Sequence, residues 1–163
     1  MPTSQSKLIL LDNTVLSNFA EVKRTDIVLS LCNGCTTTPE AWSELQSGIA
    51  IGRLPKNAWK TLHVTELTDL ELDLANRLSN ALGAGERSCI AVAVNRAGLF
   101  VTDDRKARQV ALDLGVKVTG TLGILVVAVE RQIIIIDEAN QYLAQMIRNG
   151  YRSPVDDLSN LLT

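Results

Sequence analysis

The sequence predicts an α/β fold, a three-layer α/β/α sandwich around a mainly parallel central sheet. Short apolar runs of strand length alternate along the chain with amphipathic stretches of helical period. This alternation requires crossover connections, which place parallel strands in one sheet and helices on both of its faces. The chain has 163 residues, 46% of them apolar, which suffices for one domain with its own core. We therefore expect a single domain over residues 1–163.

The first third of the chain predicts one strand followed by short helices. Residues 7–11 form a continuous apolar run, which suits a strand buried on both faces. Residues 15–19 and 27–31 are expected to be short helices. The dipeptide Thr38-Pro39 is a helix start, with an N-cap threonine and a first-turn proline, and leads into a helix over residues 41–45.

The middle of the chain predicts a short strand and a well-capped helix. Residues 62–64 are expected to be a strand that holds the only histidine, His63, in a structural role. Thr68 and Glu71 have the spacing of a capping box, which marks a helix start. The apolar stripe of this helix is expected to consist of Leu70, Leu74 and Leu78.

Two glycines, Gly83 and Gly85, precede a further helix whose inward face is expected to carry Ile90, Ala93, Val94 and Ala97. A second strand is expected at residues 99–101. The helix that follows, residues 104–114, should bury Ala107, Val110, Ala111 and Leu114 and turn Arg105, Lys106 and Arg108 largely outward.

The last third predicts a third strand at residues 116–118, a buried helix at 122–129 and a fourth strand at 133–136. From Glu138 onward the chain is expected to be helical again. A break is expected at Ser153-Pro154.

Charge and composition exclude several classes of protein. Sixteen basic residues against eighteen acidic ones give a net charge of −2, which argues against a generic nucleic-acid coat protein. The N-terminus lacks the pattern of a signal peptide, and the apolar stretch 122–136 is interrupted by Glu130 and Arg131. We therefore expect a cytoplasmic protein without a membrane span.

The three cysteines do not predict a metal or redox site. Cys32 and Cys35 form a C-x-x-C motif, but the sequence has no second motif of this kind to complete a zinc site. A redox motif would need a strand before the pair and a helix after it. We expect buried or half-buried thiols.

Acidic residues follow two different strands of the predicted sheet. Asp12 comes directly after the first strand, and Asp103 and Asp104 follow the second. Because the carboxyl ends of parallel strands meet at one edge of a sheet, these acids are expected to lie there together. The alternative is that an aspartate after a strand only caps the next helix. That alternative explains the adjacent pair less well, because neighbouring like charges repel.

Two glutamates extend the acidic set. Glu86 shares the inward face of its helix with Ile90, where a carboxylate is costly unless it is paired or bound to metal. The N-terminal helix turn lowers that cost, so a purely structural role remains open. Glu44, taken alone, fits a solvated helix residue. Several converging carboxylates suit Mg²⁺ or Mn²⁺, and such clusters support phosphodiester chemistry because the metal activates water and stabilises charge at phosphorus.

Five segments in order and spacing resemble PIN-domain proteins, most closely the prokaryotic branch related to the toxins of toxin–antitoxin pairs. The likeness runs from about Leu8 to about Tyr151. The segments are residues 11–19, 39–45, 82–86, 101–108 and 120–125. Each motif alone is weak, whereas the ordered set is specific. Residues 152–163 are expected to be a C-terminal extension beyond the likeness.

The resemblance implies an α/β/α sandwich and a ribonuclease that cuts single-stranded RNA with Mg²⁺ or Mn²⁺. It implies that Asp12, Glu44, Glu86 and either Asp103 or Asp104 are catalytic, that all of these except Glu44 hold the metal directly, and that Glu44 acts directly or through water. Thr14 matches a small hydroxyl residue near the first aspartate of the family. Family members commonly dimerise, and toxin members are held inactive by a small antitoxin protein.

Basic residues that could contact an RNA backbone are few. Arg105 and Arg108, with Lys106 between them, are the candidates closest to the acids, and Lys23 and Arg24 form a second local pair. A solvated helix face explains the first group equally well. The near-neutral charge of the chain is compatible with an RNA substrate if cations neutralise the clustered acids.

Two other functions are weighed against the ribonuclease. A phosphatase of the haloacid-dehalogenase type also begins with a strand and a nucleophilic aspartate, but Thr14 stands where its second aspartate is needed, and Glu86 would have no role. A catalytically silent binding module with the same fold is the second alternative. A receiver-like phosphorylation domain would want an acidic pair after the first strand, where Asn13 and Thr14 stand.

Overall fold

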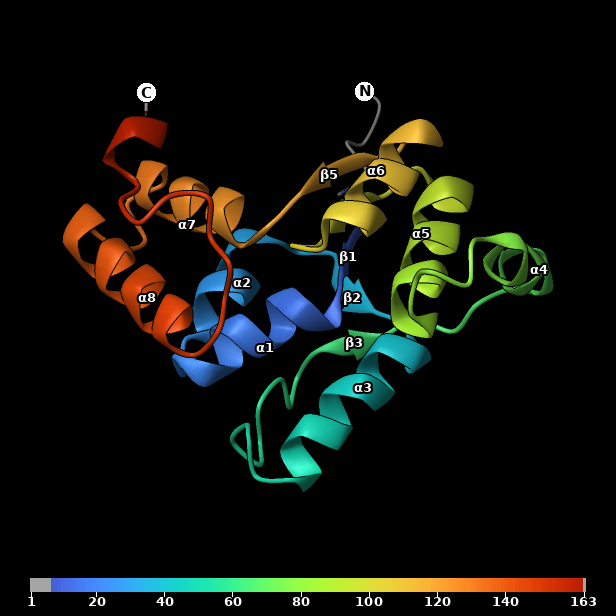
Figure 1. The fold of residues 1–163 in the computed structure, drawn as a ribbon, viewed down its shortest axis with the longest axis horizontal. Coiled ribbons are helices and arrows are strands. Elements are labelled where there is room, and N and C mark those ends of the chain that lie inside the picture. The colour runs from blue at the N-terminus through green and yellow to red at the C-terminus, as the bar shows by residue number, and fades with distance from the viewer. Residues whose placement is uncertain (1–6, 163) are drawn as a thin grey trace.

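A computed structural model describes residues 7–162, which form a five-stranded parallel sheet with helices on both faces (Figure 1). The strands are β1 (Ile9–Leu11), β2 (Cys35–Thr37), β3 (His63–Val64), β4 (Leu99–Val101) and β5 (Lys117–Thr119). Their order in the sheet is β3-β2-β1-β4-β5. The predicted α/β/α sandwich with a parallel sheet is therefore confirmed. Residues 1–6, in which no signal peptide is expected, and residue 163 lie outside the described residues.

The helices divide into two groups, one on each face of the sheet. Side chains of β1 and β4 alternate between two cores: Leu11 and Val101 pack into one with α1, α2, α7 and α8, whereas Leu10 and Phe100 pack into the other with α5 and α6. Among residues 7–162, no helix is both long and apolar enough to cross a membrane. The helices are α1 (Asn13–Glu21), α2 (Thr25–Leu31), α3 (Pro39–Ala50), α4 (Asp69–Arg77), α5 (Ala84–Arg96), α6 (Arg105–Asp113), α7 (Thr121–Glu130) and α8 (Ile136–Arg148), followed by a 3₁₀ turn at Ser159–Leu161.

The strand order places a topological switch point between β1 and β4. The chain adds β2 and β3 on one side of β1 and then returns to add β4 and β5 on the other side. Leu11 pairs with Val101, so the residues that follow these two strands are neighbours at the same edge of the sheet. This edge is where ligands bind in open parallel sheets.

The predicted helix starts are confirmed by their cap contacts. The Thr38 hydroxyl accepts a hydrogen bond from the Ala41 amide at 3.2 Å, with Pro39 in the first turn of α3. At α4, Thr68 and Glu71 exchange side-chain and backbone hydrogen bonds, which is the predicted capping box. Each cap satisfies amides that the first helical turn leaves unpaired.

The strand assignment from sequence is wrong in two places. Strand β2 was not predicted because its threonines make it polar, but the Thr37 hydroxyl donates to the Leu11 carbonyl at 2.7 Å and Thr36 bonds to Thr65 at 2.6 Å. The strand predicted at residues 133–136 does not form. Gln132 turns the chain with a φ of 60°, and the Ile133 amide donates to Ala128 at 2.9 Å, so the run connects α7 to α8.

The predicted inward stripe of α4 is wrong at Leu70. Leu70 is 66% exposed, whereas Leu74 and Leu78 are partly buried and Glu71 is fully buried. Glu71 is paired with Arg96 of α5, whose Nη2 lies 2.6 Å from Oε1. Burial raises the pKa of Glu71, but the hydrogen bonds from Arg96 and from the Thr68 amide outweigh it and lower the pKa to about 2. The face that α4 turns toward α5 is therefore held by this ion pair together with Leu78, which packs against the core.

Three further residues predicted to face inward lie at the surface. Val94 is 36% exposed and Leu114 is 43% exposed. Ala97 is exposed and ends α5 in a left-handed conformation with a φ of 53°. The other predicted inward residues Ile90, Ala93, Ala107 and Ala111 are buried, so the prediction fails mainly toward the C-terminal ends of the two helices.

Removing the charge of Arg96 is expected to destabilise the protein, because Glu71 would remain buried with its hydrogen bonds from Thr68 and Asn95 but without a basic partner. We expect Arg96→Met to lower the free energy of unfolding by about 3 kcal/mol. The matched control is Arg77→Met, since the Arg77–Asp73 pair of α4 is exposed and such pairs contribute less than about 1 kcal/mol. Urea unfolding of both variants measures the difference, and equal losses would contradict it.

The cysteine prediction is wrong for one pair. Cys32 and Cys35 form a disulfide across the turn between α2 and β2, with their Cα atoms 5.6 Å apart, a separation that suits this bond. A helix precedes the pair and a strand follows it, which is the reverse of the redox arrangement considered from the sequence. Cys89 is a free, buried thiol, as expected.

The segment after α8 packs onto the domain. Leu158 is fully buried in the core that contains α7 and α8, and its amide donates to the Asn140 side chain at 2.8 Å. Tyr151 is half-buried against the same core, and its amide donates to the Met146 carbonyl at 2.9 Å. The chain between Tyr151 and Leu158 is therefore held at both ends.

Candidate active site

Asp12 is the most buried acid at the switch point. It follows β1 and caps α1, and it is only 1% exposed. Oδ1 accepts a hydrogen bond from the Asn13 amide at 2.8 Å, and Oδ2 accepts one from the Thr102 hydroxyl at 2.7 Å. Burial raises the pKa of Asp12 to about 6, with a contribution from Glu44, although the hydrogen bonds oppose the rise. Two hydrogen bonds thus hold the carboxylate rigidly, and its burial disfavours the charged form.

Thr102 connects the two strands that form the site, and the sequence did not single it out. Its hydroxyl donates to Asp12 and accepts from the Asp104 amide at 3.2 Å. The side chain is fully buried at the end of β4. A threonine after a β-branched strand carries no local sign of this role, because its partner lies ninety residues away in sequence.

Glu86 lies in the first turn of α5 and faces the other acids. Its Oε2 accepts a hydrogen bond from the Gly83 amide at 3.1 Å, closing the N-terminus of the helix. Burial raises the pKa of Glu86 to about 7, and the charges of Asp12, Asp104 and Glu44 add to the rise in that order. The charges of Asp12, Asp104 and Glu44 therefore all act on Glu86.

Glu44 reaches this region from α3 because Gly85 leaves room for it. The Gly85 amide donates to Glu44 Oε1 at 3.1 Å. A Cβ atom at position 85 would come within 2.9 Å of the same oxygen and within 3.0 Å of the Ala41 Cα. A side chain at this position would therefore separate α3 from α5 and displace Glu44.

Four acids, Asp12, Glu44, Glu86 and Asp104, surround this edge of the sheet, and three of them lie at helix N-termini. Asp12 caps α1, Asp104 caps α6 and Glu86 lies in the first turn of α5. The positive end of each helix dipole lowers the cost of a nearby negative charge. In residues 7–162, no ion pair joins Asp12, Glu44, Glu86 or Asp104 to a basic side chain. The donor set is thus oxygen-rich and negatively charged, and it suits a hard divalent cation.

Asp103 and Asp104, adjacent in sequence, have different surroundings. Asp103 accepts hydrogen bonds from the Thr121 amide at 2.8 Å, the Thr121 hydroxyl at 2.6 Å and the Asn18 amide group at 3.0 Å. Burial nevertheless raises its pKa. Both its oxygens are engaged in joining β4 to α1 and to the start of α7. Asp104 uses Oδ1 to cap Ala107 at 2.8 Å, and no hydrogen bond from residues 7–162 reaches its Oδ2.

Gly120 allows this close approach of Asp103. A Cβ atom at position 120 would lie 2.5 Å from Asp103 Oδ1 and 3.0 Å from both Arg108 Nη1 and the Thr102 carbonyl. The glycine before α7 therefore lets the helix N-terminus contact the carboxylate directly. Gly120 has no side chain to cap α7, so the Asp103 carboxylate caps this helix by accepting the hydrogen bond from the Thr121 amide.

We expect the two neighbouring aspartates to give opposite results when each is replaced by asparagine. Asp103→Asn places a donor opposite the Asn18 amide group, so we expect the free energy of unfolding to fall by about 2 kcal/mol. Asp104→Asn keeps a good N-cap and should leave stability almost unchanged. It should instead weaken Mn²⁺ binding. Calorimetric titration and thermal unfolding of both variants separate the roles, and weakened metal binding in Asp103→Asn alone would reverse them.

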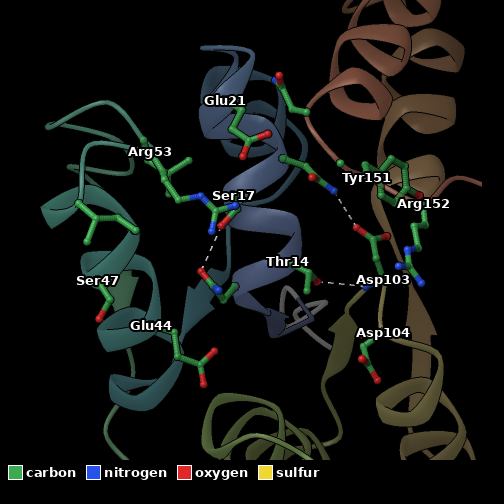
Figure 2. Close-up of a pocket in the computed structure, with 17 residues that line it drawn as sticks. Thr14, Ser17, Glu21, Glu44, Ser47, Arg53, Asp103, Asp104, Tyr151 and Arg152 are labelled. Atoms are coloured by element: carbon green, nitrogen blue, oxygen red, sulfur yellow. Dashed lines mark hydrogen bonds between the residues drawn. The ribbon is translucent and has the colours of Figure 1, made fainter.

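Glu44 and Asp104 line a cleft of about 580 Å³ that runs along α1, whereas Asp12 and Glu86 do not line it (Figure 2). Glu44 and Ser47 lie on one wall, Asp104 and Arg152 on the other, with Thr14 and Ser17 of α1 between them. The Thr14 hydroxyl donates to Asp12 at 3.4 Å and accepts from the Asp103 amide at 3.3 Å. Thr14 therefore contacts the residues that follow both strands.

The predicted basic residues lie beside the acids. Arg105 is exposed on the first turn of α6, and Arg108 is half-buried with Nη1 3.4 Å from the Thr102 carbonyl. Arg108 also lowers the pKa of Asp103, against the larger effect of burial. Lys106 is exposed. Arg24 is engaged elsewhere, because it pairs with Asp26 at 3.0 Å and stacks on Tyr142.

One family model matches nearly the whole chain. The model of family DUF3368, described as a PIN domain, matches residues 8–163. The chain is similar to the crystal structure of PAE2754 from Pyrobaculum aerophilum, with 17% identity and a TM-score of 0.49 over 68% of this chain and 98% of that one. No curated protein matches the sequence.

Proposed function

The chain belongs to the PIN-domain family, whose fold is of the nuclease type, and from this premise we propose that it is a Mg²⁺- or Mn²⁺-dependent endoribonuclease for single-stranded RNA. One observation carries the proposal. Asp12, Glu44, Glu86 and Asp104 come from four separate elements, the charges of the other three raise the pKa of Glu86, and no ion pair in residues 7–162 joins any of the four to a basic side chain. A site that only stabilised the fold would be expected to neutralise such a cluster.

Asp12, Glu86 and Asp104 are the residues proposed to hold the cation, with Glu44 supporting them. In residues 7–162 no three His, Cys, Asp or Glu side chains stand close enough to bind one ion as they are placed. Glu44 is exposed and Glu86 half-buried, so rotation of these two side chains completes the set at low cost. Asp12 is the fixed member, because two short hydrogen bonds hold it.

The residues around the acids supply positioning. The bound cation would activate water and stabilise charge at the phosphate. Thr102 fixes the orientation of Asp12, while Arg105 and Arg108 are placed to bind a backbone phosphate beside the acids. Neither lysine nor histidine lines the cleft among the residues described, and His63 lies exposed on the edge strand β3. The chain's own candidates for proton transfer are therefore the acids.

The biological setting is proposed from the family resemblance. We propose that the protein is the cytoplasmic toxin of a toxin–antitoxin pair, that a small antitoxin protein inhibits it, and that it works as a homodimer. Co-expression with the product of the adjacent gene, followed by co-purification and a growth assay, tests the first two points.

The proposed activity is tested by incubating the protein with labelled single-stranded RNA and Mn²⁺, Mg²⁺ or a chelator. We expect endonucleolytic products with either metal and none with the chelator. A folded protein that binds no divalent metal would favour the catalytically silent module. Transfer of phosphate from a phosphate ester to Asp12 would favour a phosphatase of the haloacid-dehalogenase type.

A further inference from the structure

A second hollow adjoins the acidic cleft and has the opposite charge balance. It encloses about 940 Å³ and is lined by three arginines, Arg105, Arg108 and Arg152, against two acids, Asp103 and Asp104. The cleft along α1 is lined by four acids and two arginines. Both hollows share Asp103, Asp104, Tyr151 and Arg152, so they meet at the acidic cluster.

The three arginines differ in how they are held. Arg108 is anchored by the Thr102 carbonyl. The side chains of Arg105 and Arg152 are exposed and form no hydrogen bond or ion pair with the described residues. Asp103 does not neutralise them by direct contact, since Thr121 and Asn18 occupy both of its oxygens. Two unpaired guanidinium groups therefore face a hollow beside the proposed metal site.

The position of Arg152 is fixed by the backbone on both sides. Gly150, with a φ of 111°, turns the chain after α8, and Tyr151 packs against the core. Leu158 anchors the segment farther along. Figure 2 shows Arg152 next to Asp103, on the wall opposite Glu44. An arginine on a backbone segment that is anchored at both ends loses less entropy on binding than one on a free tail.

We propose that Arg152, together with Arg105 and Arg108, binds the backbone phosphate next to the one that is cut in single-stranded RNA. The segment 149–154 is thus part of the substrate site, a role that the sequence left open. This inference rests on the proposed function. Guanidinium groups suit the task because each can donate two parallel hydrogen bonds to phosphate oxygens. The hollow also lets the RNA strand pass the acids without entering the more acidic cleft along α1.

The test compares Arg152→Ala and Arg152→Lys with Arg148→Ala. Arg148 is an exposed arginine at the end of α8 that lines neither hollow, so it matches the loss of charge. Binding is measured by fluorescence anisotropy with a labelled RNA of about 12 nucleotides, in the Asp12→Asn background to prevent cutting. Cleavage kinetics are measured in the wild-type background with Mn²⁺.

We expect Arg152→Ala to raise the Kd about tenfold and to reduce the salt dependence of binding by about one phosphate contact. KM should rise while kcat stays within about twofold, because the residue contacts substrate away from the bond that breaks. Arg152→Lys should keep the salt dependence and recover part of the affinity. Arg148→Ala should match the parent.

Three results would overturn the inference in distinguishable ways. If the parent protein cuts RNA and Arg152→Ala binds it as Arg148→Ala does, Arg152 is not a phosphate contact and the proposed function stands. If the parent neither binds nor cuts RNA, the proposed function and the inference fail together. A fall in kcat with unchanged KM would assign Arg152 to positioning of the acids and would also contradict a phosphate contact.

Discussion

Asp12→Asn is expected to reduce metal-dependent cleavage of single-stranded RNA on the order of a thousandfold, the effect of losing a fixed electrostatic group at a reaction centre. Asparagine has nearly the same shape. Its Oδ1 atom still accepts the hydrogen bond from the Asn13 amide, and the Thr102 hydroxyl can turn to accept one from its Nδ2 group. The loss therefore isolates the charge of the carboxylate. Initial rates at saturating Mn²⁺, with calorimetric titration of the metal, measure it.

The matched control for this variant is Asp113→Asn. Asp113 is an exposed acid at the end of α6 that lines neither hollow. We expect it to retain the wild-type rate. Metal-dependent cutting that survives Asp12→Asn at the wild-type rate would remove Asp12 from the site, whatever the other acids do.

The second large effect is a loss of stability as pH rises in the absence of divalent metal. Asp12 has a folded pKa of about 6 against 3.8 in the unfolded chain, so the folded state binds the proton more tightly. Its stabilising effect is complete below pH 3.8 and is lost as pH rises toward 6. For this buried group the loss is on the order of 3 kcal/mol. The raised pKa of Glu86, about 7, extends the loss in the same direction.

Glu71 gives the opposite dependence in a lower pH range. Its folded pKa of about 2 lies below the ordinary value of 4.5, so its contribution is present above pH 4.5 and is lost as pH falls toward 2. The metal-free protein should therefore be most stable in mildly acid solution. Saturating Mn²⁺ should restore stability at neutral pH, because the cation binds the ionised acids of the folded state.

Urea unfolding between about pH 4 and pH 8, with Mn²⁺ or with a chelator, measures this dependence. Asp12→Asn should remove a large part of the decline above pH 4 and reduce the response to Mn²⁺. A metal-free protein with equal stability at pH 5 and pH 8 would contradict the burial cost assigned to Asp12.

Local patterns in the sequence predicted most of the fold. Strand β1 and strand β4 are apolar runs, and the caps at Thr38 and Thr68 have residue types that rarely serve another purpose. Strand β2 could not be found in this way, because its buried hydroxyls are satisfied by Leu11 and Thr65, which are distant in sequence. Residues at 133–136 have strand propensity, but the turn at Gln132 and contacts with α7 override it.

The candidate site, like the fold, was predicted from the sequence only in part. Proximity of Asp12 to the acids after β4 follows from parallel strands, so the sequence was sufficient to place them at one edge. The choice between Asp103 and Asp104 depends on Asn18 and Thr121, which reach Asp103 only through the folded structure. The buried pair of Glu71 and Arg96 was missed for a similar reason, since an acid inside a leucine pattern looks solvent-facing.

Acids gathered at the N-termini of α1, α5 and α6 make this edge a locally frustrated part of the energy landscape. A landscape in which interactions support one another would neutralise these charges, but here their repulsion is retained. Selection of variants for thermal resistance without metal would therefore enrich neutral side chains at positions 12 and 86. Such variants would gain stability and lose the proposed activity. A stabilised variant that keeps the activity should therefore leave positions 12 and 86 unchanged.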